Sequence, residues 1–370
     1  MNKIRVIISG GGTGGHIFPA VSIANALREL NPAVEILFVG AEGRMEMQRV
    51  PAAGYKIVGL PIRGLYRPLW RLANIGVAID FLKSKRLAKK TLRDFCPDVA
   101  VGVGGYASSA TLNAAYELGI PCLIQEQNSY AGLTNKTLAK KAEKICVAYE
   151  GMERFFPKDR IILTGNPVRQ GLLDPSLTKT EATAIFNMEP ELPTLLIIGG
   201  SLGARTVNES VLNNLDLIAH SQVQVIWQTG GYYYNDIQGE LARKGRPSNL
   251  YVTDFISRMD QAYKAADLVI SRAGASSISE LCLLGKPSIL VPSPNVAEDH
   301  QTCNAMALVN RDAALMVRDA EAVEQLIPLA LKTVIDTGRL KTLGGNAYKM
   351  AFKDSAKIIA EEVLKLVKRK

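Results

Sequence analysis

Short apolar runs alternate along the chain with longer helix-like segments, and this alternation predicts parallel β-sheets covered by helices. In the first half, the apolar runs occupy residues 4–8, 34–39, 57–60, 99–103, 122–125, 144–147 and 161–163. The runs are continuous and lack strict alternation with polar residues, which is typical of strands buried on both faces. Helix-like segments such as 19–30 separate the runs.

The same pattern begins again after turn residues at 164–169. A second set of predicted strands occupies residues 195–198, 223–228, 250–253, 268–271 and 288–291. The chain therefore predicts an α/β protein of two doubly wound, Rossmann-like parallel-sheet domains that face a central cleft. We expect the first domain over 1–165 and the second over 166–352, with the C-terminal helix 353–370 packing back on the first.

Composition supports a globular protein. The chain has 370 residues, 47% of them apolar and 21% charged, which is enough for two packed domains. No apolar run approaches the roughly 18 residues of a membrane span, and no signal-peptide pattern precedes the first predicted strand. Five scattered cysteines without a C-x-x-C pair are typical of thiols in a reducing cytosol, not of a disulfide or zinc framework.

The net charge of +9 is concentrated in one segment. Residues 61–93 hold nine basic side chains against one acid, Asp80. Apolar and aromatic residues are interleaved with them, including Leu65, Tyr66, Leu69 and Trp70. This mixture favours contact with anionic lipid, although a core helix with a solvated basic face stays possible. We expect no nucleic-acid partner because the chain lacks an RNA- or DNA-binding module.

The first predicted strand runs into a glycine-rich turn and then a helix. The turn reads Ser9-Gly10-Gly11-Gly12-Thr13-Gly14-Gly15-His16. Unpaired N–H groups at a helix start favour an anion such as phosphate. His16 supplies a titratable ring beside it, so the turn indicates group transfer on a phosphorylated substrate.

Other functions are compatible with part of this motif. Gly10, Gly12 and Gly15 match the dinucleotide fingerprint, which leaves an NAD(P)-dependent oxidoreductase open. That class needs an acid at the end of the second strand, and Glu42 comes late and after a glycine. A second glycine turn, Gly199-Gly200-Ser201-Leu202-Gly203, follows the predicted strand 195–198. No Gly-Lys-Ser/Thr follows either glycine turn, which excludes a P-loop nucleoside triphosphatase.

The second half carries a sharper constellation at residues 271–280. Here a predicted strand ends in small residues and a helix begins, with Glu280 one turn further on. The N–H groups of 275–277 could hold a diphosphate, and the carboxylate could accept both hydroxyls of a ribose, as a nucleotide-sugar donor requires. A plain helix-capping box, with Ser276 or Ser277 as the N-cap, is the alternative.

Polar residues also follow several strands of the first half. Tyr106, Glu126 and Asn128 are expected at the same sheet edge as Thr13 and His16, because carboxyl ends of parallel strands meet at one edge. Packing alone would not require such a convergence. In the second half, His300 and Gln301 begin a helix, and a solvated helix end is the simpler interpretation of that pair.

Taken together, the motifs resemble a known family along the whole chain. They occupy residues 10–16, 104–106, 126–135, 165–169, 199–205, 273–280 and 299–305, in matching order and spacing. The chain resembles the bacterial family 28 glycosyltransferases that convert lipid I to lipid II in peptidoglycan synthesis. That resemblance implies the GT-B fold and inverting transfer of N-acetylglucosamine to a muramyl 4-hydroxyl, without metal or cofactor. No Asp-x-Asp metal signature is present.

The resemblance also implies roles for individual residues. Those expected to contact the substrates are Thr13, Gly14, Gly15, Asn128, Arg169, Ser201, Ile256, Ala275, Ser276, Ser277, Ile278, Ser279, Glu280 and Gln301. Within that set, Glu280 would bind the ribose and Ile256 would lie beside the uracil. The acceptor side would hold Tyr106 and Asn135 together with the two candidate bases, His16 first and Glu126 second.

Several further expectations follow from the resemblance. Many members have histidine where this chain has Gln125, so an imidazole role there is lost and more weight falls on His16. Expected partners are UDP-N-acetylglucosamine, undecaprenyl-diphosphate-linked muramyl-pentapeptide, anionic inner-leaflet lipid and other cell-wall synthesis proteins. The expected location is the cytoplasmic face of the plasma membrane, with peripheral attachment. A membrane adaptor without catalysis and a GT-B transferase with another acceptor stay open.

Overall fold

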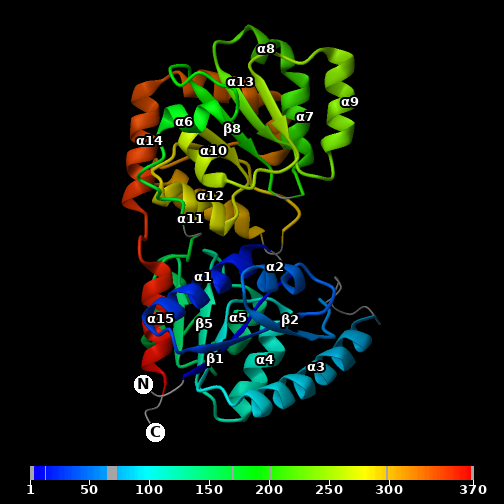
Figure 1. The fold of residues 1–370 in the computed structure, drawn as a ribbon, viewed down its shortest axis with the longest axis vertical. Helices are drawn as coiled ribbons and strands as arrows, with labels where there is room; N and C mark the ends of the chain where they lie inside the picture. Colours follow the sequence, from blue (N-terminus) through cyan, green and yellow to red (C-terminus); the bar gives the residue numbers. More distant parts are fainter. Residues whose placement is uncertain are drawn as a thin grey trace. The chain divides into compact units, whose positions relative to one another are not determined.

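The chain forms two compact units in a computed structural model (Figure 1). One unit comprises Met1–Arg169 with Phe352–Lys370, and the other comprises Gln170–Ala351. The structure describes residues 4–12, 14–64, 73–168, 171–200, 202–296 and 299–367. Each unit is built around its own parallel sheet.

The first unit contains a seven-stranded sheet in the order β3-β2-β1-β4-β5-β6-β7. Its strands are β1 Arg5–Ser9, β2 Glu35–Ala41, β3 Lys56–Leu60, β4 Val99–Gly102, β5 Cys122–Glu126, β6 Lys144–Val147 and β7 Ile161–Leu163. Its helices are α1 Gly14–Leu30, α2 Glu46–Ala52, α3 Ala73–Phe95, α4 Tyr106–Glu117, α5 Leu133–Leu138 and α15 Ser355–Lys365, with 3₁₀ turns at Met152–Arg154 and Lys158–Arg160.

Alternate residues of the strands point to two different helical layers. Val6 and Ile8 pack in the cluster that contains residues of α1 and α15, whereas Ile7 packs with residues of α3 and α4. Burial on both faces explains why these strands read as continuous apolar runs. Figure 1 shows α15 beside α1, although the two helices lie at opposite ends of the sequence.

The second unit contains a six-stranded sheet in the order β10-β9-β8-β11-β12-β13. Its strands are β8 Thr194–Ile198, β9 Gln224–Gln228, β10 Leu250–Thr253, β11 Leu268–Ser271, β12 Ser288–Leu290 and β13 Leu315–Met316. Its helices are α6 Lys179–Ala184, α7 Arg205–Asn213, α8 Leu215–His220, α9 Tyr234–Lys244, α10 Met259–Ala265, α11 Ala275–Leu283, α12 His300–Val309, α13 Ala322–Val334 and α14 Thr337–Lys349, with a 3₁₀ turn at Asp319–Glu321.

All twelve predicted strands are present, each within two residues of its expected bounds, and the prediction of two doubly wound parallel sheets is confirmed. The strand order reverses between β1 and β4 in the first sheet and between β8 and β11 in the second. Ligands of such sheets bind beside the carboxyl ends of the strands at the reversal point. The turns after these four strands are therefore the expected ligand-binding positions.

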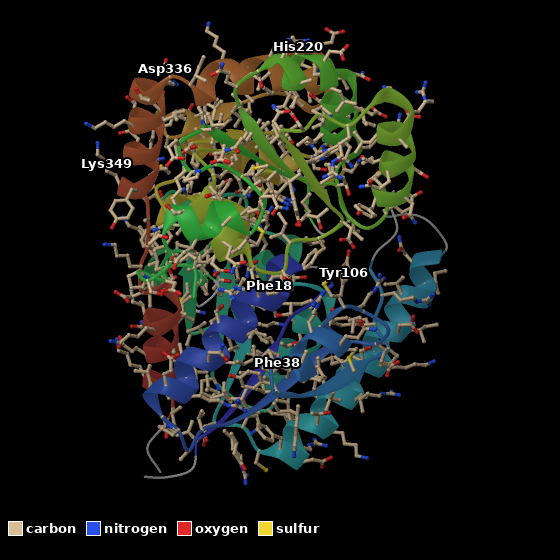
Figure 2. All side chains as sticks on the ribbon, turned by 45° about the horizontal axis from the view of Figure 1, so that its top comes forward. Phe18, Phe38, Tyr106, His220, Asp336 and Lys349 are labelled. Atoms are coloured by element: carbon tan, nitrogen blue, oxygen red, sulfur yellow. The ribbon has the colours of Figure 1, made fainter. Side chains whose placement is uncertain are left out.

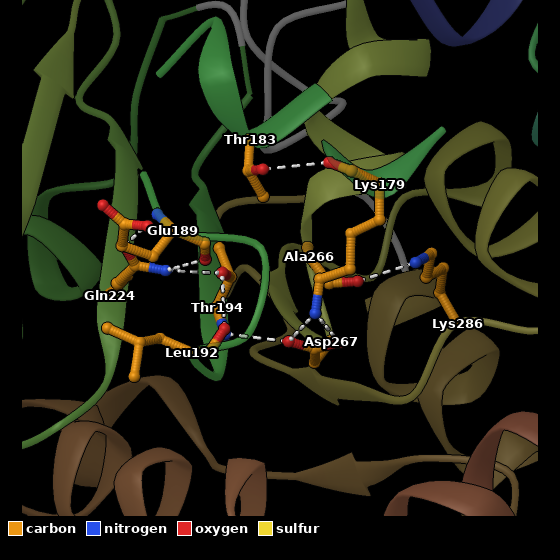
Figure 3. Close-up of polar contacts among 9 residues, drawn as sticks. All are labelled: Lys179, Thr183, Glu189, Leu192, Thr194, Gln224, Ala266, Asp267 and Lys286. Carbon is orange, nitrogen blue, oxygen red and sulfur yellow. Dashed lines mark hydrogen bonds and ion pairs between the residues drawn. The ribbon is translucent and has the colours of Figure 1, made fainter. Parts of the chain in front are cut away.

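The opposite, amino-terminal edge of the second sheet is held by an ion pair and backbone contacts (Figure 3). Lys179 Nζ lies 2.8 Å from one oxygen of Asp267, whose other oxygen accepts from the Thr194 N–H at 2.9 Å. Nearby, Lys286 Nζ donates to the Ala266 carbonyl at 2.6 Å. These contacts tie the starts of β8, β11 and β12 together.

Lys286 makes the stability of the fold depend on alkaline pH. Burial lowers the pKa of Lys286 from 10.5 to about 8, although the charge of Asp267 opposes the shift. Between these values the unfolded chain keeps a proton that the folded chain has released, so the free energy of unfolding rises with pH. In the wild type, the free energy of unfolding from urea titrations should rise by about 3 kcal/mol between pH 8 and 10.5. In Lys286→Met this rise should be absent. Lys341→Met, at an exposed position of α14, is the control and should keep the wild-type pH dependence.

Candidate functional site

Two glycine turns meet at the reversal point of the first sheet. Gly105 has a φ of +85°, and a Cβ built there would lie 2.5 Å from the carbonyl oxygen of Gly11. A Cβ on Gly10 would lie 2.1 Å from a methyl carbon of Val103. The turns after β1 and β4 therefore pack backbone against backbone, and side chains at these positions would separate them.

A buried carboxylate, that of Glu46, accepts hydrogen bonds from the glycine turn after β1 and from the end of β2. The Gly12 N–H donates to Oε2 of Glu46 at 3.0 Å, and the Ala41 N–H donates to Oε1 at the same distance. Glu46 is completely buried. The N–H of Gly12 is thus occupied by the protein itself, and an incoming phosphate must use other groups. No motif or periodicity had pointed to this residue.

His16 lies in the first turn of α1, which begins at Gly14 and not near Pro19 as the pattern had predicted. Its Nδ1 atom is 3.1 Å from the Gly11 carbonyl oxygen. Because a carbonyl oxygen only accepts, Nδ1 carries the proton and Nε2 of the neutral ring carries the lone pair. The ring edge packs against Gly104, where a Cβ would lie 2.9 Å from Nε2.

Tyr106 begins α4 at the same edge, and its side chain is labelled in Figure 2. The residue is 49% exposed. Its ring lies against Gly64, where an added Cβ would come within 2.7 Å of the phenol oxygen. Gly14 and Gly15 form the start of α1. Thr13 and Arg169, both predicted to bind substrate, lie outside the described residues.

Glu126 ends β5, and both of its oxygens accept from the loop that follows. One accepts from the Asn128 N–H at 3.0 Å and from the Asn128 side chain at 3.3 Å. The other accepts from the Gly132 N–H at 3.0 Å and from Asn135 Nδ2 at 2.9 Å. Glu126 and Asn135 are each 2% exposed. The carboxylate therefore shapes the segment that carries Asn128.

Gln125 points away from solvent and is completely buried. Its Nε2 donates to Asn166 Oδ1 at 2.9 Å, and Asn166 Nδ2 donates to the Gln127 carbonyl at 2.9 Å. Gln127 in turn donates to the Gln125 side chain. The position is thus part of an amide network that ties the end of β5 to the segment after β7.

The second unit offers a helix start without a side-chain cap. Gly274 is the N-cap of α11 and, having no side chain, makes no capping hydrogen bond to the first N–H groups of that helix. The capping-box alternative is therefore wrong, since neither Ser276 nor Ser277 is the cap. Oγ of Ser276 is buried without a hydrogen-bond partner among the described residues. The N-terminus at Ala275 keeps its donors for an anion.

The later residues of α11 are buried or hydrogen-bonded within the second unit. Ile278 is 2% exposed and belongs to the core, and Ser279 Oγ donates to the Ala275 carbonyl at 2.9 Å. Glu280 is 3% exposed, and its Oε2 accepts from the Tyr263 hydroxyl at 3.0 Å. Tyr263 orients the carboxylate, and no motif of the sequence pointed to this residue.

Replacing Tyr263 by phenylalanine tests this orientation. The ring stays in the core while the hydrogen bond to Glu280 is lost, which is worth roughly 1.5–3 kcal/mol when a partner is charged. We expect the KM for the nucleotide-sugar donor that the motif predicts to rise about tenfold and kcat to change much less. Tyr234→Phe, on α9 of the same unit, is the control. An unchanged donor KM would leave Tyr263 a packing residue only.

Two polar side chains connect the turns at the carboxyl edge of the second sheet. Gln228 donates to the Gly200 carbonyl at 3.1 Å and accepts from the Ile256 N–H at 3.0 Å. Arg272 pairs with Asp319 and also donates to Thr206 Oγ1 at 3.2 Å. The turns after β8, β9, β10 and β11 are thus cross-linked.

Of the three remaining residues that were predicted to bind the sugar donor, the structure describes two. Ile256 is 6% exposed, and its N–H is already engaged by Gln228. Gln301 Oε1 accepts from the Ser293 N–H at 2.9 Å and holds the loop before α12. Ser201 lies outside the described residues.

Two all-parallel α/β domains, with a glycine-capped helix start and the buried carboxylate of Glu280 at the second reversal point, define a glycosyltransferase of the GT-B fold. Residues 6–147 match the glycosyltransferase family 28 N-terminal domain, and residues 194–359 match its C-terminal domain. The chain belongs to glycosyltransferase family 28. This membership decides against the dinucleotide-dependent oxidoreductase.

Similar proteins carry one name. A Parabacteroides distasonis protein is 62% identical over the full length of both chains, and a Porphyromonas gingivalis protein is 56% identical over 99% of this chain and 96% of its own. Both are named UDP-N-acetylglucosamine–N-acetylmuramyl-(pentapeptide) pyrophosphoryl-undecaprenol N-acetylglucosamine transferase. The crystal structure of Acinetobacter baumannii MurG is similar with a TM-score of 0.77 and 27% identity, over 98% of this chain and 99% of that one.

Proposed function

We propose that the protein transfers N-acetylglucosamine from UDP-N-acetylglucosamine to undecaprenyl-diphosphate-linked N-acetylmuramyl-pentapeptide. The product is lipid II for peptidoglycan synthesis. The full-length identity of 62% to a relative with this named activity carries the proposal. The uncapped start of α11 and the oriented carboxylate of Glu280 support the donor half of it.

The reaction is a single in-line displacement with inversion. The 4-hydroxyl oxygen of the muramyl sugar forms a bond to the anomeric carbon, and the bond from that carbon to the UDP oxygen breaks. UDP leaves with the electron pair, and the N–H groups at Ala275–Ser277, helped by Arg169, stabilise its charge. Nε2 of His16 takes the hydroxyl proton. We assign Glu126 to holding Asn128 and Asn135, because both of its carboxylate oxygens accept from N–H groups of residues 128–135.

A transfer assay with radiolabelled UDP-N-acetylglucosamine and a lipid I analogue tests the proposal. We expect label in a product of lipid II structure. A non-muramyl lipid diphosphate serves as the second acceptor. Label transferred only to that acceptor would support a GT-B enzyme of another pathway, and donor binding without transfer to either would oppose the proposal.

We further propose that the first unit rests on anionic lipid at the cytoplasmic face of the membrane. Within the described residues, no helix has both the length and the apolar character to cross a bilayer. Leu65, Tyr66, Leu69 and Trp70 lie outside those residues. Support comes from α3, whose exposed face carries apolar side chains first and basic ones further on, in the order Ile75, Ile79, Leu82, Arg86, Lys90 and Arg93.

The apolar part of this face provides a membrane test. Ile75, Ile79 and Leu82 are 62%, 49% and 59% exposed, whereas Val77 on the other face is buried. Changing the three exposed residues to serine should weaken binding to anionic liposomes about tenfold or more, because each loses apolar area for burial in lipid. Leu217→Ser, at a 50% exposed site of the second unit, is the control. Unchanged liposome binding of the triple variant would mean that this face of α3 is exposed to solvent and does not contact lipid.

A further inference from the structure

One peptide group in the first glycine turn is held at both of its polar atoms by side chains. The N–H of Gly12 donates to Oε2 of Glu46 at 3.0 Å. The carbonyl oxygen of Gly11, in the same peptide plane, accepts from Nδ1 of His16 at 3.1 Å. A carboxylate, a peptide and an imidazole therefore form one hydrogen-bonded chain.

The position of Glu46 in this chain is tightly determined. Its second oxygen accepts from the Ala41 N–H at 3.0 Å, and the residue is completely buried. Cβ atoms added at Gly11 and Gly40 would lie 2.0 Å from its Oε1 and 2.6 Å from its Cγ. The glycines beside Glu46 thus leave the space that its side chain fills.

We propose that Glu46 is a positioning residue for His16 and acts through the Gly11–Gly12 peptide. The proposal rests on the function proposed above, in which His16 receives the acceptor proton. A carboxylate on the N–H of a peptide polarises the group, and its carbonyl becomes a stronger acceptor. The proton then stays on Nδ1 and the lone pair on Nε2. Carboxylate–histidine pairs of hydrolases use the same logic without an intervening peptide.

The tautomer of His16 can be measured directly. The chain has three histidines, His16, His220 and His300, so ¹⁵N-histidine labelling gives few signals, and a His16→Gln spectrum assigns one of them. At a pH where the rings are neutral, we expect wild-type His16 to be protonated on Nδ1. In Glu46→Gln the ring should shift toward the Nε2-protonated form. The amide places an NH2 donor where one of the two carboxylate oxygens accepts, so the Gly12 and Ala41 N–H groups are no longer both satisfied in this geometry.

Activity and a matched control complete the experiment. Glu46→Gln should lower kcat about 10–100-fold, as loss of an orienting partner of histidine does elsewhere, with little change in donor KM. Glu143→Gln removes a carboxylate that accepts from the Cys122 N–H at the opposite sheet edge, and it should alter neither the tautomer nor kcat. Thermal unfolding of both variants reports on the fold.

The outcomes separate this proposal from the function. An Nε2-protonated ring in the folded wild type would overturn the role of Glu46, even if the variant cannot be produced. So would a Glu46→Gln protein with an unchanged tautomer. A fully active His16→Ala enzyme, with the Nδ1 tautomer confirmed in the wild type, would instead overturn His16 as the base.

Discussion

Replacing His16 by alanine should lower kcat about 10²–10⁴-fold, the range typical of general-base catalysis. Its Nδ1 is engaged by the Gly11 carbonyl, so the neutral ring presents the lone pair of Nε2. The proposed donor site is built from residues of the second unit, whereas His16 belongs to the first. The KM for UDP-N-acetylglucosamine should therefore change little. Steady-state transfer to a lipid I analogue measures both constants.

The control for this prediction is a second histidine with the same backbone contact. His220 Nδ1 lies 2.8 Å from the Asp216 carbonyl on α8, a helix of the second unit. His220→Ala should keep wild-type kcat. If His16→Ala keeps it too, the acceptor proton leaves by another route, and water would be the first candidate because Glu126 is engaged on both oxygens.

The fold was accessible from the sequence because burial on both faces leaves a simple signal. Each strand of the two sheets is a short run without polar interruption, so its bounds can be read almost to the residue. Strand β13 was missed since it contains two residues, Leu315 and Met316, which form no pattern. The start of α1 was placed too late because glycines have low helix propensity.

The candidate site could be predicted only where chemistry follows a strand directly. His16, Tyr106, Glu126 and Glu280 each occur at or within two turns of a strand end, where the fold puts ligands. Whether Ser276 and Ser277 cap a helix or leave its N–H groups open depends on backbone dihedrals that the residue types do not determine.

Partners from distant segments gave no local signal at all. Glu46 reaches Gly12 across 34 positions of sequence, and Tyr263 reaches Glu280 across 17. Each is an ordinary residue in its own segment, at a helix start or in a core. Their roles become evident only in the folded structure, where the sheet brings the two segments together. Residues that orient a functional group are therefore harder to predict than the group itself.

Replacing Glu280 by alanine should raise the KM for UDP-N-acetylglucosamine about 100-fold. A carboxylate that accepts from both ribose hydroxyls makes two charge-assisted hydrogen bonds, each worth roughly 1.5–3 kcal/mol. Part of that energy is offset because the carboxylate is 3% exposed and already accepts from Tyr263 before the nucleotide binds. Calorimetric titration with UDP measures the loss without any acceptor present.

Two comparisons make the Glu280 prediction specific. Glu240→Ala, on α9 of the same unit, removes a carboxylate that pairs with Arg243 on the surface, and UDP binding should stay unchanged. In Glu280→Ala, UDP should lose affinity while a nucleotide analogue without ribose hydroxyls binds equally to variant and wild type. Equal loss for both ligands would mean that the carboxylate supports the structure of α11 and does not contact the ribose.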